Sequence, residues 1–190
     1  MAIDFSQVKT VTIPEGPVCE ITDYAGNLLW EGVGWHPIWK GSKTCSVNTN
    51  GTATPVLKGA EDNFAQTKSG TGYTPKIRIT YEYSKSNTNY TFKYAYIIND
   101  NWHLGDDFSP GNPITIEAVS DSTDSVILFA PGCKRNSIPE LYGYAGIRKR
   151  RDKENNRIIF DMYPNVSSNI NSYDPKFLIT FKVTKIEQYY

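Results

Sequence analysis

The stretch Lys76-Ile-Arg-Ile-Thr-Tyr-Glu-Tyr83 decides the fold class, because apolar and polar side chains alternate along it without interruption. Such alternation places one set of side chains on each face of the chain and is typical of a half-buried β-strand. Turn-forming residues occupy positions 84–89, and a second strand pattern runs from Tyr90 to Ile98. Two strand patterns joined by turn residues predict a β-hairpin here.

Further strands are expected on both sides of this pair. The patterns fall at Ile114–Val119, Ser125–Phe129, Arg157–Met162 and Lys176–Ile186, each bounded by Gly, Pro, Asn or Asp. Residues 40–54 read as strand edge and loop, and Asp62–Gln66 as one helical turn within a loop. Several short strands with such punctuation indicate an all-β protein with a β-sandwich body, jelly-roll-like or Ig-like.

Alternation also predicts which side chains form the core of this body. The expected core residues are Ile77, Ile79, Tyr81, Phe92, Tyr94, Ile116, Ile127, Phe129, Ile159, Leu178 and Phe181.

The N-terminal segment reads as a separate small element. Strand patterns at Val8–Ile13, Val18–Thr22 and Leu28–Glu31 predict a three-stranded β-meander, and Gly32-Val-Gly34 follows as a hinge. We therefore expect an arm over residues 1–32 and a body over residues 33–190. A meander of this size buries too little apolar area to be stable alone, so the arm is expected to dock on the body or on another chain.

Composition limits the partners. Among the 190 residues, 20 Lys and Arg balance 20 Asp and Glu, so no global field favours nucleic acid or anionic lipid. Residues 1–10 lack the pattern of a signal peptide, and no apolar run reaches membrane-spanning length, so synthesis in the cytoplasm without membrane insertion is expected. Cys19, Cys45 and Cys133 are odd in number and widely spaced, which favours buried free thiols over disulfides.

Motifs that carry catalysis are absent from the sequence, which shows no G-x-S-x-G, P-loop, H-E-x-x-H or G-x-G-x-x-G pattern. His36 and His103 are expected to be partly buried packing or hydrogen-bonding residues. The acidic loop Asn99–Asp107 offers Ca²⁺ ligands but lacks EF-hand spacing, and reads as a solvated loop. The basic run Arg148-Lys-Arg-Arg151 could contact phosphates or an acidic partner, but an exposed hairpin tip rimmed by opposite charges is the favoured explanation. We predict no catalytic residue, no metal and no cofactor.

The aromatic residues are the most suggestive set for binding, since exposed Trp and Tyr side chains stack on sugars or anchor protein interfaces. Buried, they would simply form the core. The candidate ligand-binding residues are Trp35, Trp39, Trp102, Tyr83 and Tyr96, with a possible host-surface glycan as the ligand.

The arm carries a resemblance. Its segments Val8-Lys-Thr-Val-Thr-Ile-Pro-Glu-Gly16, Val18-Cys-Glu-Ile-Thr-Asp23 and Gly26-Asn-Leu-Leu-Trp30 resemble a segment at the front of structural proteins from tailed phages and prophages of low-GC Gram-positive bacteria. The resemblance covers about a sixth of the chain and implies a component of the virion. It further implies that the arm attaches to a capsid or tail neighbour.

Three hypotheses follow. The first is a phage virion structural protein in the head or tail, of decoration, fibre or adaptor type, that forms a homo-oligomer and binds other virion proteins. Its assembly residues would be Val11, Ile13, Val18, Ile21, Leu28 and Trp30. The second is a carbohydrate- or receptor-binding module that uses the aromatic residues above. The third is a hydrolase of cell-wall polymers that uses acids among Asp100, Asp106 and Asp107.

Overall fold

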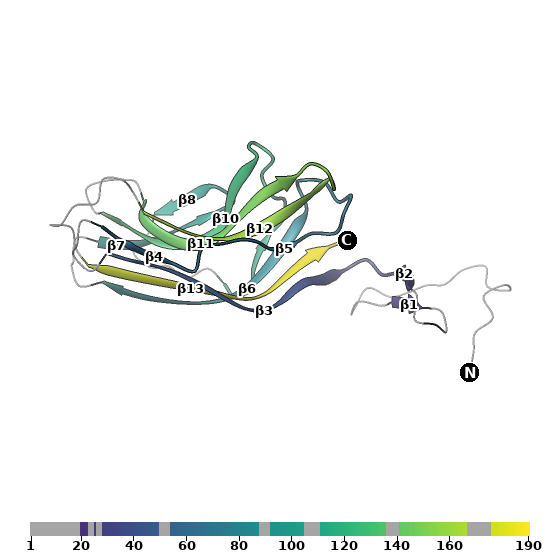
Figure 1. Ribbon diagram of the computed structural model, residues 1–190, viewed down its shortest axis with the longest axis horizontal. Coiled ribbons are helices and arrows are strands. Elements are labelled where there is room, and N and C mark those ends of the chain that lie inside the picture. The colour runs from purple at the N-terminus through teal and green to yellow at the C-terminus, as the bar shows by residue number, and fades with distance from the viewer. Residues whose placement is uncertain are drawn as a thin grey trace. The chain divides into compact units, whose positions relative to one another are not determined.

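The computed structural model (Figure 1) describes residues 20–22, 25, 28–49, 54–87, 92–104, 111–135, 141–166 and 176–190. The chain divides into two compact units. The smaller unit comprises Met1–His36 with Tyr189–Tyr190, and the larger unit comprises Pro37–Gln188. All regular structure in the described residues is β-strand, which confirms the predicted all-β class.

The larger unit is a sandwich of two sheets, which lie face to face as two layers in Figure 1. The six-stranded sheet has the order β5-β12-β11-β10-β7-β8. Its strands are β5 (Glu61–Gln66), β7 (Phe92–Ile98), β8 (Asn101–Leu104), β10 (Ser125–Arg135), β11 (Leu141–Asp152) and β12 (Arg157–Val166). Each neighbouring pair in this sheet is antiparallel.

The five-stranded sheet has the order β4-β3-β13-β6-β9. Its strands are β3 (Trp35–Asn48), β4 (Val56–Lys58), β6 (Lys76–Asn87), β9 (Ile114–Ile116) and β13 (Phe177–Tyr189). The predicted β-sandwich body is therefore confirmed.

An aromatic cluster joins the two layers. The ring of Tyr81 in β6 lies 4.6 Å from that of Phe129 in β10 and 5.7 Å from that of Phe181 in β13. These three side chains are essentially inaccessible to water, as are Ile77, Ile79 and Ile116. The core prediction is thus correct for these six residues, because strict alternation fixed which face of each strand is buried.

The core prediction is wrong by one position in two strands. In β12 the apolar side chains buried in the core are those of Ile158, Phe160 and Met162, whereas Ile159 is only partly buried. In β13 the buried set begins Phe177, Ile179, and Leu178 lies on the other face. Both strands contain adjacent apolar residues, so either the odd-numbered or the even-numbered side chains could face the core. Alternation alone does not choose between these two arrangements.

Two other predicted core residues are only partly buried. Tyr94 is partly buried against the main cluster, and Ile127 packs against a smaller cluster around Ala95 and Ile97. The side chain of Phe92 lies outside the described residues.

The predicted hairpin over residues 76–98 is wrong. β6 pairs with β13 and β9, whereas β7 pairs with β10 and β8, so the connection passes from one sheet to the other. Alternation reports which face is buried and does not identify the hydrogen-bonded partner. The tyrosines of the two strands consequently do not form one face across a hairpin.

The predictions for two short segments are also corrected. The segment read as strand edge and loop is strand throughout residues 40–48, where it continues β3. Asp62–Gln66 is part of β5 rather than a helical turn. Asn63 has a positive φ of 52°, and the pairing of β5 with β12 shifts register beside it, so an irregular edge strand breaks the period-2 pattern.

In the smaller unit, β1 (Glu20–Thr22) and β2 (Leu28–Glu31) form a two-stranded antiparallel sheet with Ile21 opposite Trp30. The predicted strand over Val8–Ile13 lies outside the described residues. At the other end of this unit, Gly34 and Tyr190 exchange two backbone hydrogen bonds of 2.5 and 3.0 Å. The ring of His36 stacks on that of Tyr190 with centroids 4.0 Å apart.

Candidate functional site

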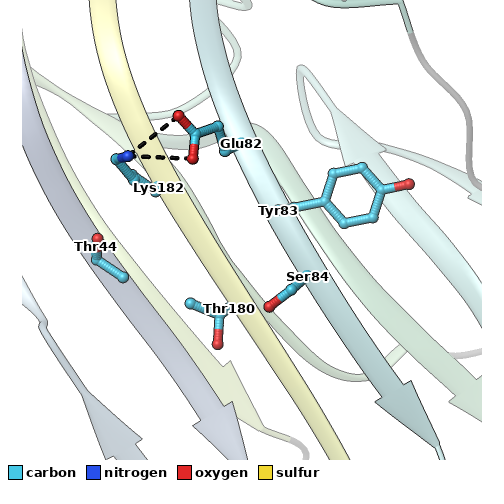
Figure 2. Close-up of a pocket in the computed structure, with 6 residues that line it drawn as sticks. All are labelled: Thr44, Glu82, Tyr83, Ser84, Thr180 and Lys182. Atoms are coloured by element: carbon cyan, nitrogen blue, oxygen red, sulfur yellow. Dashed lines mark hydrogen bonds and ion pairs between the residues drawn. The ribbon is translucent and has the colours of Figure 1, made fainter.

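A shallow groove of about 180 Å³ lies on the outer face of the five-stranded sheet (Figure 2). Three adjacent strands line it: β3 through Thr44, β6 through Glu82 and Ser84, and β13 through Thr180 and Lys182. The Lys182 ammonium donates to both oxygens of the Glu82 carboxylate at 3.1 Å. Tyr83 also borders the groove, but its ring points away from this ion pair and packs against the core.

The groove is a polar, solvated sheet surface. The charges of Glu82 and Lys182 neutralise each other, and the other side chains that line the groove carry hydroxyl groups. The groove can therefore form hydrogen bonds with a neutral polar ligand or with water. Its acid is already engaged by Lys182. The groove on its own therefore defines no reaction.

The five aromatic candidates do not converge on one surface. Trp39 meets Phe64 edge-to-face at 5.2 Å and packs against the core, as Tyr83 does from β6. Tyr96 lies opposite His103 in β8 and stacks on it at 4.7 Å, and the next pair of the two strands is Ile97 with Trp102. These contacts identify Trp39, Tyr83 and Tyr96 as residues that pack against other described side chains.

Trp102 and Trp35 differ from those three. Trp102 is 46% exposed on the edge strand β8, where its indole can contact a partner. Trp35 belongs to the smaller unit and meets Tyr189 edge-to-face at 5.5 Å.

The six predicted assembly residues lie in the arm. Ile21, Leu28 and Trp30 are placed by the pairing of β1 with β2, and their side chains are outside the described part of the structure. Val11, Ile13 and Val18 lie outside it altogether.

Of the three acids proposed for hydrolysis, the structure describes Asp100 but not Asp106 or Asp107. Asn99 and Asp100 form the two-residue turn between β7 and β8, both with positive φ. The Asp100 carboxylate accepts a 2.7 Å hydrogen bond from the amide of Ile127, and the Asn99 side chain bonds to Ala118 and Ser120. These side chains hold a hairpin turn in place. Asp106 and Asp107 are outside the described residues.

His36 and the two described cysteines, Cys45 and Cys133, are buried. His36 is buried, with Nε2 2.7 Å from the carbonyl oxygen of Gly32, while His103 is exposed, contrary to expectation, and only its stacking on Tyr96 fits. Cys45 and Cys133 are buried free thiols, as predicted. Burial raises the pKa of the Cys45 thiol to about 12, so it stays protonated and unreactive at neutral pH.

The basic run was predicted as an exposed hairpin tip, and this prediction is wrong. Arg148–Arg151 lies within β11, and the tip is formed by residues 153–156. Lys149 points into the sandwich, is fully buried and donates to the carbonyl oxygen of Thr123 at 3.2 Å. Arg151 pairs with Asp121 and Asp124, so these two acids hold the end of β11.

Sequence reasoning named Arg148 and Arg150 in the basic run but missed the cluster that they form with Asp161 on the outer face of the six-stranded sheet. Asp161 in β12 is 0% exposed. Its Oδ2 accepts three hydrogen bonds, from Nε and Nη2 of Arg148 (3.0 and 2.7 Å) and from Nε of Arg150 (2.6 Å). Its Oδ1 accepts from Nη2 of Arg150 (2.8 Å) and from the amide of Asn63 (2.9 Å).

The protonation of Asp161 follows from these contacts. Burial raises the pKa of its carboxyl, but the hydrogen bonds from Arg150, Asn63 and Arg148 outweigh burial and lower the pKa overall. The signal in the sequence was an acid flanked by apolar residues, Phe160 and Met162, because such an acid needs a charged partner when the strand is buried.

Comparisons with protein-family models, with curated proteins and with solved structures find no match. Among the described residues, no group of three or more His, Cys, Asp or Glu side chains could hold a metal ion. None of the described segments is a helix long and apolar enough to cross a membrane.

Proposed function

We propose that this chain is a structural protein of a tailed-phage or prophage particle, located in the head or tail, whose N-terminal arm attaches it to neighbouring subunits. It binds other virion proteins and further copies of itself, and the proposal assigns it no catalytic step and no cofactor. The resemblance of the first 32 residues provides the virion context.

The observation that carries the proposal is the division of the chain into two units. The described strands of the smaller unit, β1 and β2, are three and four residues long and pair with each other. A two-stranded sheet of this size is marginal in water, so it gains stability when a third strand or an apolar surface covers it. A neighbouring subunit supplies such a surface.

The edges of the body support the same function. Val56 and Leu57 are exposed on β4, at one edge of the five-stranded sheet, and Trp102 is exposed on β8, at one edge of the six-stranded sheet. Edge strands with exposed apolar side chains are places where a strand from another chain, such as its arm, can add.

A double substitution in the arm tests the proposal. Val11 and Ile13 share one face of the predicted strand Val8–Ile13, so Val11→Asp with Ile13→Asp places two charges on the face expected to dock. Sedimentation over a concentration series should show the full chain associating and this variant remaining monomeric.

The matched control is Thr10→Asp with Thr12→Asp, which charges the opposite face of the same strand and should preserve association. Equal association of all three proteins would contradict the proposal.

A further inference from the structure

The Arg148–Arg150–Asp161 cluster has features that holding the sheet together does not explain. Removing a carboxylate from water is costly, and apolar residues of similar volume often stabilise a protein as well as a buried ion pair does. Here two arginines surround one buried acid on the outer face of a sheet, where each guanidinium also reaches solvent. Their side chains are 21% and 36% exposed.

The hydrogen bonds to Asp161 orient both guanidinium groups. Each uses Nε and Nη2 towards Asp161, and Nη1 of neither donates to a described residue. The guanidinium of Arg148 also lies over the ring of Tyr163, 4.1 Å from its centroid, which restricts its rotation. Two donor groups are therefore held in fixed directions at the surface before any ligand binds.

On the solvent side of Arg148 and Arg150, their positive charge is balanced only by the more distant carboxylate of Asp62. Asp62 in β5 is 74% exposed and approaches both arginines through a single oxygen, at 3.5 Å from Arg148 and 3.9 Å from Arg150. Neither distance is a good hydrogen bond. An oxyanion that is free to move closer can replace Asp62 and accept direct bonds from both groups.

We infer that Arg148 and Arg150 form a binding site for a phosphate group, with Asp161 as the residue that positions them and Asp62 as an internal competitor. A phosphate offers more acceptor oxygens than the single carboxylate oxygen of Asp62, and paired guanidinium groups match its geometry. Tyr163 and its neighbour Tyr144, with ring centroids 6.2 Å apart, border the site and can contact an organic group attached to the phosphate.

The inference does not depend on the arm, since all of these residues belong to the larger unit. It concerns a site on the opposite sheet from the groove in Figure 2. It can therefore fail while the assembly function holds, and the reverse is also true.

Titration of the full chain with inorganic phosphate, followed by the backbone amide resonances of β5, β11 and β12, tests the site. We expect saturable shifts at Asn63, Arg148 and Arg150. Asp62→Asn removes the competitor without touching the buried bonds and should tighten binding about threefold. Arg150→Gln should weaken it about tenfold.

Glu61→Gln is the matched control, because Glu61 is the adjacent acid but pairs with Lys43 instead. It should leave phosphate affinity unchanged. A second titration with glucose 6-phosphate shows which kind of phosphate the site binds. Affinity equal to that for inorganic phosphate indicates free phosphate as the ligand, and tighter binding indicates a phosphate carried on a larger molecule. Absence of saturable shifts with both probes, or identical affinity of the Asp62→Asn variant and the wild type, would overturn the inference.

Discussion

At the scale of single residues, Asp161 shows how one side chain can hold three strands. It lies in β12 and binds two arginines of β11 and the Asn63 amide of β5. Its five hydrogen bonds satisfy a carboxylate that would otherwise be very costly to bury. The edge strand β5 depends on it most directly, because its pairing with β12 is irregular at this point.

Asp161→Asn should destabilise the body by about 2 kcal/mol, below the usual cost of breaking a buried ion pair because the arginines still reach water. Urea unfolding at neutral pH measures this loss. Because the folded pKa of Asp161 is lowered, its contribution is complete above about pH 4, the value for an unfolded Asp, and is lost as the pH falls further.

The difference in stability between wild type and variant should therefore shrink as the solution is acidified below about pH 4. A difference that stays constant down to the acid transition would show that the Asp161 charge contributes nothing to stability.

Alternation in the sequence predicted burial at residue scale wherever it was strict, as at Ile77, Ile79 and Tyr81. It failed at Ile159 and Leu178, where adjacent apolar residues permit two phases. The cluster around Asp161 was not predicted because its members are separated in sequence, and only the pairing of β11 with β12 places Arg148 opposite Asp161.

At the scale of elements, most strands were predictable and their partners were not. The stretch 76–98 contains two strands, as expected, but hydrogen bonding assigns them to different sheets. The local pattern is the same for a hairpin and for a connection that crosses the sandwich, since both bury one face of each strand. The basic run at 148–151 was placed in a tip for a related reason: its neutralising acids come from distant segments.

Gly59 marks another crossing between the sheets, from β4 to β5. It has φ of +73°, and a Cβ there would collide with the carbonyl oxygen of Thr44. Gly59→Ala should therefore cost about 2 kcal/mol or more, from the left-handed backbone and from the collision.

Gly70→Ala is the control, since Gly70 has φ of +82° with open space around it and should lose only the backbone part, about 1 kcal/mol. Urea midpoints of the two variants give the comparison. Equal losses would show that the approach of Thr44 to Gly59 does not constrain the crossing.

At the scale of the whole molecule, the sequence predicted a sandwich body with a small β element in front, and the structure confirms the sandwich. The sequence could not order its strands, because strand order depends on long-range pairing that no local pattern encodes. The proposed functional surfaces are the arm, the exposed edges and the arginine pair. The sequence singled out the arm, Trp102 and the basic run, whereas exposed Val56 and Leu57 and the buried Asp161 were found only in the structure.

The proposed function makes a direct demand on the smaller unit: it has to connect copies of the chain, and the body alone should not associate. The body should also remain folded without the arm, because Pro37–Gln188 is compact by itself and contains the aromatic cluster around Tyr81.

Sedimentation of the full chain beside a variant that begins at Gly34, over the same concentration series, tests this demand most directly. We predict that the full chain associates as its concentration rises and that the shortened chain stays a folded monomer. Two stable monomers would contradict the account, and would show that the arm serves the fold of its own chain.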